Sequence, residues 1–432
     1  MHTTLTFNDL YDYFLRGCKK TTDFQIGVEW EKIGVYRDSG KAITYSGERG
    51  VEAIFRNLIQ KHGWKSAFSH HPVIALTKGS GSITLEPGGQ IELSGQKAHL
   101  IQDNARELYM HLEEIRSISE SLGIVWLGIG AQPYSVAEDI DWVPKERYKI
   151  MRENLKDSGA LTFLMMKETA SVQVSLDYGS EKDAIHKLKL AMGLSPFLTA
   201  MFANSPLRDG KPSGYLSRRA HIWEHTAPER SGILWEELDP AAGFKNYIEY
   251  ALDVPMLFLM RKNQWVGVRG INFRGFMKKG YEGMSPTIED WEMHLSGIFT
   301  EARLKNYIEI RSIDCQKTPM GLAAVAFIKG LFYSEDSLKK AGQMLSGFTG
   351  KDLKKLHSEA SIQGLKATLP DGQSITEICA ELIRLAEDGL GDEKKYLEPL
   401  KLNIEKKITP AEIILNCFDA NKPILSCAAI EG

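Results

Sequence analysis

The sequence predicts an α+β fold, in which strands and helices mix through about Ser312 and a mainly helical portion follows. Three observations support this prediction: several short segments alternate polar and aliphatic residues, longer segments place apolar residues at helical spacing, and only helical patterns occur beyond Thr318. The 432 residues suffice for one large domain or two fused ones. We expect one domain over 1–432, with a mixed core at 1–318 and a helical portion at 319–432.

The expected helices and strands follow a definite order along the chain. Segments Gln25–Val35, Ala170–Asp177 and Tyr307–Ile313 alternate cleanly and are predicted to be strands. A long helix is expected at Ala98–Gly123, where the final glycine is a typical helix stop, and Ile124–Ile129 reads as a short strand. The remaining helices are predicted at about 6–17, 48–62, 182–192, 322–331, 334–345, 351–358, 375–386, 393–403 and 410–418.

The segment Ser82–Ser94 carries the most unusual strand pattern. Its even-numbered positions from 84 to 94 are polar, apart from Gly88, and include Glu86 and Glu92, whereas aliphatic residues alternate with them near both ends. Glutamate is depleted in strands, and two carboxylates on one face repel each other unless positive charge lies between them. This pattern makes a hard divalent cation the candidate ligand.

The interruption at Pro87–Gln90 decides whether the two acids share a face. A four-residue hairpin loop would pair Glu86 with Ile91 and would place Glu86 and Glu92 on opposite faces. A loop of odd length, or a bulge in a continuing strand, would keep them together. The cation-site hypothesis requires one of these two geometries.

Polar faces also occur on three other predicted strands, which carry Glu29 and Glu31, Ser171 and Gln173, and Glu309 and Arg311. For any single strand, a solvated face is the simpler explanation. If the strands share a sheet, however, five carboxylates line one surface. Such a surface is costly without metal ions, and Mg²⁺ usually brings a phosphorylated substrate with it. Arg311 would then neutralise a phosphoryl group during its transfer.

Two basic clusters are weaker candidates. Arg218, Arg219, His221 and Trp223 could clamp a substrate carboxylate, and the alternative is a basic surface loop with a buried tryptophan. Arg147 and Arg152 are expected, from the pattern alone, to be ordinary surface charges.

Several classes of protein are disfavoured. The net charge of −3 argues against a general nucleic-acid binder. We find no uncharged apolar run long enough to span a bilayer and no targeting segment at the N-terminus, so we expect a cytoplasmic protein. Phosphate-loop, dinucleotide, HExxH and GxSxG motifs are absent. The five cysteines are scattered without a CxxC pair, so we expect five free thiols.

Long motifs in this chain resemble those of the plant-type glutamate–cysteine ligases, which bacteria also carry. The motifs are GVEWEK at Gly27–Lys32, SITLEPGGQIELSG at Ser82–Gly95, RYKIMR at Arg147–Arg152, SVQVSLD at Ser171–Asp177, FANSPLRDGKPSGYLSRRAHIW at Phe202–Trp223, YALDVPM at Tyr250–Met256 and YIEIRS at Tyr307–Ser312. They span nearly the whole chain in fixed order, and the sequence is therefore similar to a bacterial member of this type.

The resemblance implies a glutamine-synthetase-like fold, with a curved antiparallel sheet around an acidic cavity. It implies that ATP phosphorylates the side-chain carboxylate of glutamate and that the cysteine amine displaces phosphate, giving γ-glutamylcysteine. The implied Mg²⁺ ligands are Glu29, Glu31, Glu86, Glu92 and Glu309, with Arg311, Glu92 and Glu309 as catalytic residues. The implied substrate-binding residues are Arg219, Trp223, Arg147, Arg152, Ser171 and Gln173. A monomer or homodimer without nucleic-acid or membrane partners is expected.

Three alternatives stay open at this point. A carboxylate–amine ligase with another acceptor amine would need the same acidic surface, because that surface determines phosphoryl chemistry but not the nucleophile. A phosphotransferase of the same fold would transfer phosphate to a nitrogen and stop. A metal- or nucleotide-binding module without turnover would leave the pairing of Arg311 with Glu309 without a purpose.

Overall fold

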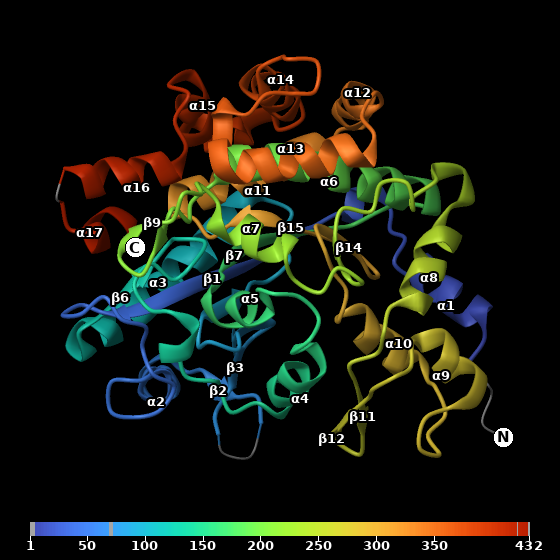
Figure 1. The fold of residues 1–432 in the computed structure, drawn as a ribbon, viewed down its shortest axis with the longest axis horizontal. Coiled ribbons are helices and arrows are strands. Elements are labelled where there is room, and N and C mark those ends of the chain that lie inside the picture. The colour runs from blue at the N-terminus through green and yellow to red at the C-terminus, as the bar shows by residue number, and fades with distance from the viewer. Residues whose placement is uncertain (1–4, 69–71, 421, 431–432) are drawn as a thin grey trace.

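This computed structural model describes residues 5–68, 72–420 and 422–430. Its centre is an antiparallel sheet with the strand order β14-β15-β7-β1-β5-β4-β3-β2, and β6 pairs with the far end of β1 (Figure 1). The strands are β1 (Ile26–Tyr36), β2 (Lys65–Ser66), β3 (Ala75–Lys78), β4 (Gly81–Leu85), β5 (Ile91–Ser94), β6 (Ile124–Leu127), β7 (Ser171–Leu176), β14 (Ala302–Leu304) and β15 (Ile308–Asp314). The α+β prediction is confirmed.

Three two-stranded sheets lie outside the central one. They pair β8 (Leu207–Arg208) with β9 (Lys211–Pro212), β10 (Ser231–Gly232) with β13 (Phe299–Thr300), and β11 (Phe258–Arg261) with β12 (Gln264–Gly267). The helices of the mixed region are α1 (Phe7–Leu15), α2 (Val51–His62), α3 (Ile101–Leu122), α4 (Glu146–Leu155), α5 (Thr162–Glu168), α6 (Glu181–Phe202), α7 (Arg218–Glu224), α8 (Phe244–Asp253), α9 (Phe273–Lys279) and α10 (Ile288–Leu295).

From Thr318 onward, helices dominate the described chain and gather on one side of the sheet (Figure 1). They are α11 (Thr318–Tyr333), α12 (Glu335–Leu345), α13 (Gly350–Gln363), α14 (Ile375–Asp388), α15 (Glu398–Glu405), α16 (Pro410–Asp419) and α17 (Ile424–Ala428). Within the described residues, no helix combines the length and the apolarity that crossing a membrane requires.

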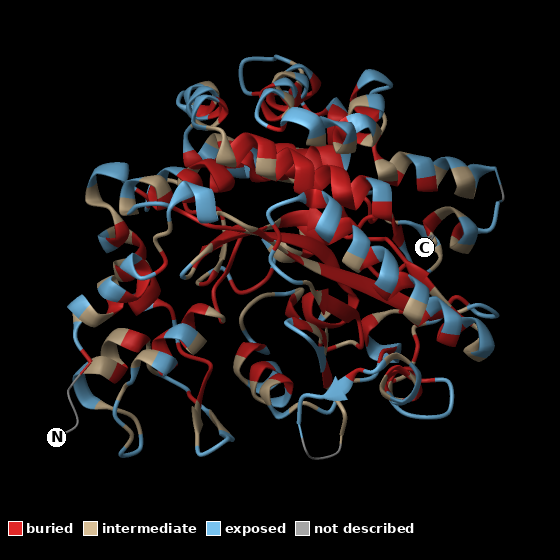
Figure 2. Cartoon of the chain, turned by 180° about the vertical axis from the view of Figure 1, so that it is seen from behind, coloured by how far each residue is buried: buried red, intermediate tan, exposed pale blue. Residues whose placement is uncertain are grey.

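One face of the central sheet is aliphatic, and helices α6 and α11 pack close to it. Val28, Trp30 and Val174 on this face are buried in the main hydrophobic core. Figure 2 shows that the strands at the centre of the molecule and the helices next to them are largely buried. The approach of α11 is close, because a Cβ atom on Gly321 would lie 2.9 Å from the Trp30 ring. Burial of this face is the main source of stabilisation for the sheet, through removal of apolar surface from water.

The length of one helix and the presence of several short strands differ from the sequence-based expectations. Helix α6 continues to Phe202, ten residues beyond its predicted end at Met192, although Gly193 and Pro196 disfavour helix locally. Every residue from Leu190 to Phe202 is buried, so tertiary packing overrides local propensity. The hairpin β11–β12 and the short strands β3 and β14 were not predicted, because segments of three or four residues carry too little periodicity.

The expectation of five free thiols is wrong for one pair. Cys417 and Cys427 form a disulfide with a Cα–Cα distance of 6.7 Å, whereas Cys18, Cys315 and Cys379 are free. Helices α16 and α17 pack against each other and bring the two sulfur atoms together, which the spacing of cysteines alone did not indicate.

Candidate active site

The hairpin between β4 and β5 has the geometry that the cation-site hypothesis requires. Leu85 pairs with Ile91, and the Glu86 amide donates to the Gln90 carbonyl at 2.9 Å. Only Pro87, Gly88 and Gly89 remain in the loop, which is therefore of odd length. Gly89 takes a positive φ of 86°, a conformation that favours glycine. Glu86 and Glu92 consequently face the same side of the sheet.

The neighbouring strands place the other acids on that same side. Glu31 of β1 lies directly opposite Glu92 of β5, and Glu29 lies opposite Gln173 of β7. Glu309 of β15 lies opposite Ser175, two positions further along β7. Residues directly opposite in an antiparallel pair point to the same face. Strands β1, β5 and β15 and the end of β4 thus present the five glutamates on one face, with β7 between β1 and β15, and we call these five glutamates the carboxylate cluster.

Each buried acid of the cluster is held by neighbouring donors. The Ser171 amide and the Gln173 side chain donate to Glu31 at 2.6 and 2.9 Å. Thr84 and Ser94 both donate to Oε1 of Glu92 at 2.9 Å. These bonds orient Glu31 and Glu92 through hydroxyl and amide groups, which add no positive charge.

In three of the acids, burial and neighbouring carboxylates outweigh the effect of the nearby cations. Burial, and then the charges of Glu86 and Glu92, raise the pKa of Glu31 to about 8. Burial, followed by the charge of Glu92, raises the pKa of Glu86 to about 7. Burial, with Glu92 and Glu309 nearby, raises the pKa of Glu29 well above its ordinary value. Oxygen donors that are crowded, buried and short of counter-charge fit a hard divalent cation such as Mg²⁺.

Glu309 differs from the other acids because three cations surround it. Arg303 and Arg311 both donate to its Oε1 at 2.6 Å, and the Lys305 ammonium lies 3.7 Å from its Oε2. Although burial opposes ionisation, these three cations hold the pKa of Glu309 well below its usual range. Its buried Oε2 accepts no hydrogen bond from the described residues and could still ligate an ion.

Arg311 is fixed at the edge of the carboxylate cluster. Its Nη1 donates to Gln173 at 2.5 Å as well as to Glu309, and its guanidinium lies 5.7 Å from the centroid of the Trp223 ring. Gln173 therefore bridges Glu31 and Arg311. This arrangement restrains a charged fork beside the acids, where it can meet an anionic group.

Helix α7 supplies a small pocket next to Arg311. The pocket is lined by Arg219, Ala220, Trp223, Phe299, Thr300, Glu301, Arg311, Ser312 and His357. Arg219 donates to the Arg311 carbonyl at 2.8 Å and lies 3.9 Å from the Asp314 carboxylate. The Ser217 hydroxyl, at the start of α7, also donates to Asp314, at 2.9 Å. Arg219 and Trp223 are thereby placed beside the carboxylate cluster.

The two arginines of the RYKIMR motif have different surroundings. Arg147 stacks on Phe258 at 4.8 Å and donates to Ser296 at 3.2 Å. Burial lowers the pKa of Arg147, whereas the charges of Glu86 and Glu92 raise it. Because these two charges act on Arg147, it lies near the carboxylate cluster. The expectation of a surface charge is therefore wrong for Arg147. Arg152 is exposed, stacks on Trp142 at 5.4 Å and is not brought to the cluster.

Sequence reasoning missed three cations near the acids. Arg303 and Lys305 were not considered, although they alternate with Ala302 and Leu304 in the manner of a strand with one polar face. Lys145 is near Glu86. Burial lowers the pKa of Lys145, and the negative charge of Glu86 raises it. Arg303 lies directly opposite Glu309 in the β14–β15 pair. That contact depends on strand register, which the local pattern does not reveal.

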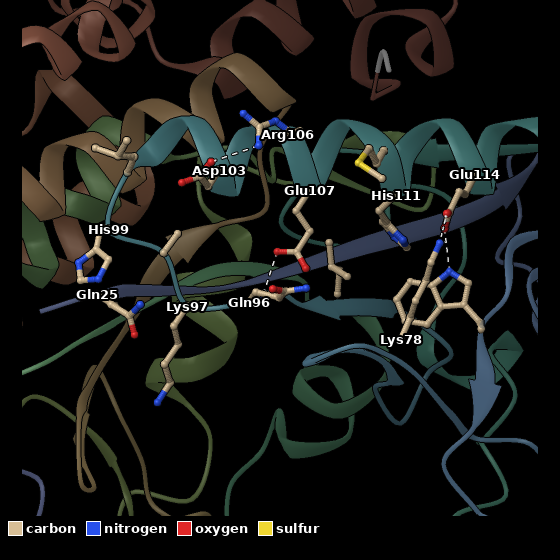
Figure 3. A pocket seen from close by; sticks show the side chains of 15 residues that line it. Gln25, Lys78, Gln96, Lys97, His99, Asp103, Arg106, Glu107, His111 and Glu114 are labelled. Atoms are coloured by element: carbon tan, nitrogen blue, oxygen red, sulfur yellow. Dashed lines mark hydrogen bonds and ion pairs between the residues drawn. The ribbon is translucent and has the colours of Figure 1, made fainter. Parts of the chain in front are cut away.

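A larger cavity of about 660 Å³ lies between α3 and the aliphatic side of the sheet (Figure 3). Glu107 and His111 point from α3 into it, and Lys78 pairs with Glu114 at 2.6 Å. The carboxylate cluster and the predicted substrate-binding residues do not contribute to its lining. The predicted site residues therefore lie on the opposite face of the sheet from this cavity.

Comparisons with known proteins place this arrangement in a family. The model of "Glutamate-cysteine ligase family 2(GCS2)" matches residues 25–424. The chain is 39% identical over 426 residues to the chloroplastic glutamate–cysteine ligase B of Oryza sativa subsp. japonica. The matched region covers 97% of this chain and 85% of the relative. It is 37% identical over 423 residues to the chloroplastic glutamate–cysteine ligase of Arabidopsis thaliana, and the matched region covers 96% of this chain and 80% of that relative.

Solved structures agree at the level of the fold. The glutamate–cysteine ligase of Francisella tularensis, solved in complex with AMP, superposes with a TM-score of 0.59 at 14% identity, over 94% of this chain and 87% of that one. A bifunctional glutathione synthetase from Pasteurella multocida matches with a TM-score of 0.51 at 12% identity, over 98% of this chain and 52% of that one. The match over residues 25–424 and the identities of 39% and 37% to the two plant ligases show that the chain belongs to the glutamate–cysteine ligase family 2.

Proposed function

We propose that this protein joins the γ-carboxylate of L-glutamate to the amine of L-cysteine and consumes ATP in doing so. A γ-carboxylate oxygen attacks the γ-phosphorus of ATP, and ADP leaves. The cysteine amine then attacks the acyl carbon, and phosphate departs with that carboxylate oxygen while the amine loses a proton. The observation that carries the proposal is the carboxylate cluster beside Arg311, in a chain of this family.

The carboxylate cluster is the proposed Mg²⁺ site. Its ligands would come from Glu29, Glu31, Glu86, Glu92 and Glu309. The support is the donor set itself: the raised pKa values of Glu31 and Glu86 favour bound protons, which a divalent cation would displace. When bound, Mg²⁺ supplies positive charge to the phosphate oxygens of ATP.

Arg311, Glu309 and Gln173 form the proposed phosphoryl-transfer group. Glu309 stays ionised because of its three cations, and it holds Arg311 through a charge-assisted hydrogen bond. Gln173 and the Trp223 ring restrict the same guanidinium from two other sides. A guanidinium fixed in advance can stabilise charge on the phosphoryl group without reorganising during the reaction.

Arg219 and Trp223 are proposed to bind the amino acid that is phosphorylated, with Arg147 nearby. The cationic and aromatic lining of their pocket suits a carboxylate attached to a short aliphatic chain. Ser171 acts mainly through its amide, which orients Glu31. His357 of α13 lines this pocket, so a helix of the C-terminal portion also contributes, and we propose one catalytic domain over 1–432.

The test is phosphate release from ATP and Mg²⁺, measured with glutamate alone, with glutamate plus cysteine, and with other amines in place of cysteine. Release that requires both glutamate and cysteine, together with formation of γ-glutamylcysteine, is the expected result. Equal release with another amine would indicate a different acceptor. Transfer of phosphate to a nitrogen without cysteine would overturn the proposal.

A further inference from the structure

Helix α7 carries three metal-ligating side chains that the proposed reaction does not use. His221, Glu224 and His225 each offer one ligand atom, and these atoms lie within 4.8 Å of one another. Because residues three and four apart share a helix face, the three side chains gather at the C-terminal turn of α7. Arg219 and Trp223 of the same helix face the pocket beside Arg311 instead.

The histidine rings are already oriented as metal ligands. Nδ1 of His225 lies 2.9 Å from the His221 carbonyl, which can only accept, so Nδ1 carries the hydrogen and Nε2 of the neutral ring keeps a free lone pair. Metal-bound histidines commonly donate their second ring nitrogen to a backbone carbonyl in this way. The His221 ring is stacked on Tyr215 at 4.1 Å with an interplanar angle of 20°, which restricts its rotation.

The surroundings leave these ligands available. Glu224 and His225 are exposed, and Glu224 has neither an ion-pair nor a hydrogen-bond partner in the described part of the chain. Arg218, whose charge acts on His221, is buried and is paired with Glu168 at 2.5 Å. Small side-chain rotations can bring three surface ligands to metal-bonding distances of about 2.0–2.2 Å.

We propose that His221, Glu224 and His225 form a binding site for Zn²⁺ or a similar transition-metal ion, separate from the carboxylate cluster. Two imidazoles and one carboxylate are ligands that Zn²⁺ prefers, with water in the fourth position, whereas Mg²⁺ prefers oxygen ligands alone. A bound ion links the middle of α7 to its last residue, Glu224, and to the capping residue His225, and it stiffens the helix that carries Arg219 and Trp223.

The experiment is a Co²⁺ and Zn²⁺ titration of the untagged, full-length protein in excess Mg²⁺, which keeps the carboxylate cluster occupied. Co²⁺ is followed by its visible absorption, and Zn²⁺ by competition with bound Co²⁺. We expect one ion per chain, and we expect His225→Ala and Glu224→Gln to weaken binding about tenfold or more. His186→Ala, which removes a single exposed histidine of α6, is the matched control and should bind as the wild type does.

The proposal fails if His225→Ala and Glu224→Gln bind Co²⁺ as tightly as the control. It also fails if the spectrum shows thiolate-to-cobalt charge transfer, which would place the ion on a cysteine. Far-ultraviolet circular dichroism and phosphate release without Zn²⁺ verify that the variants are folded, since both residues are exposed and lie outside the carboxylate cluster. The binding readout does not depend on whether the protein ligates glutamate and cysteine.

Discussion

Neighbouring residues on the two faces of β1 are equally buried but have opposite energetic effects. Trp30 is 5% exposed and packs under α11, whereas Glu31 is 7% exposed and faces Glu92. Burying the indole removes apolar surface from water and stabilises the fold. Burying the carboxylate costs free energy that its hydrogen bonds only partly offset. The aliphatic face therefore stabilises the sheet, and the carboxylate face is retained at a cost in stability.

Glu114 of α3 shows how a carboxylate elsewhere in the molecule is paired with a cation. Glu114 is ion-paired with Lys78 at 2.6 Å and also accepts from the Trp64 indole at 2.7 Å. Glu31 and Glu92 receive only amide and hydroxyl donors. A protein that needed these carboxylates only for its fold would gain from a similar cation, so the unpaired Glu31 and Glu92 indicate an external positive ligand.

The largest effect should come from the acid at the centre of the cluster. Glu92→Gln should lower Mg²⁺-dependent turnover about 10³-fold while leaving the fold intact, because an amide cannot supply the negative charge that binds the cation. Glu107→Gln, which alters a half-buried acid on the α3 side, is the control and should retain turnover. Steady-state phosphate release measures both variants. Turnover of Glu92→Gln within tenfold of wild type would remove Glu92 from the ligand set.

The adjacent residue on the other face should affect stability rather than chemistry. Leu93 is 1% exposed, and Leu93→Ala should lower the free energy of unfolding by about 3 kcal/mol through lost burial and a cavity. Denaturant unfolding of Leu93→Ala and Glu92→Gln gives the comparison directly. A larger loss of stability in Glu92→Gln than in Leu93→Ala would reverse the assignment of the two faces.

Arg311→Lys should separate charge from geometry. Nη1 of Arg311 alone donates to both Gln173 and Glu309. A lysine that keeps this bridge and the positive charge has no second nitrogen of the planar fork to offer to the phosphoryl group. We expect kcat to fall about 10²-fold with a smaller change in the KM for ATP, as measured by initial rates over a range of ATP concentrations. A change confined to KM would assign Arg311 to ground-state binding.

The smallest effect concerns pH. The folded pKa values of Glu31 and Glu86, about 8 and about 7, lie above the ordinary glutamate value, so the folded state holds more protons than the unfolded chain between pH 5 and 7. Stability of the metal-free protein should therefore fall as pH rises through this window, and saturating Mg²⁺ should flatten the dependence. Urea unfolding at several pH values measures it. Stability that rises with pH equally with and without Mg²⁺ would contradict the assignment.

The division of the strands into an aliphatic face and a carboxylate face could be predicted from the sequence, because the alternation of side chains along a strand is a local property. The period of two places Glu29 with Glu31, and Glu309 with Arg311, whatever the strands pair with. The resemblance of the motifs then indicated the family. The odd loop at Pro87–Gly89 could only be stated as a requirement, because both loop lengths are compatible with the sequence.

What escaped prediction depends on register and packing between distant segments. Arg303 meets Glu309 through the pairing of β14 with β15, and Arg147 is half-buried because the β11–β12 hairpin covers it with Phe258 and Trp265. The disulfide between Cys417 and Cys427 likewise follows from how α16 packs on α17. These contacts have no local signal in the sequence.

The most direct test of the account follows an oxygen atom. Glutamate carrying heavy oxygen in its γ-carboxylate is incubated with ATP, Mg²⁺, cysteine and the enzyme, and the released phosphate is analysed by mass spectrometry. The account predicts that one labelled oxygen passes to phosphate in each turnover and that Glu92→Gln abolishes the transfer. Phosphate that forms at the normal rate without label would show that the γ-carboxylate is never phosphorylated and would contradict the central claim.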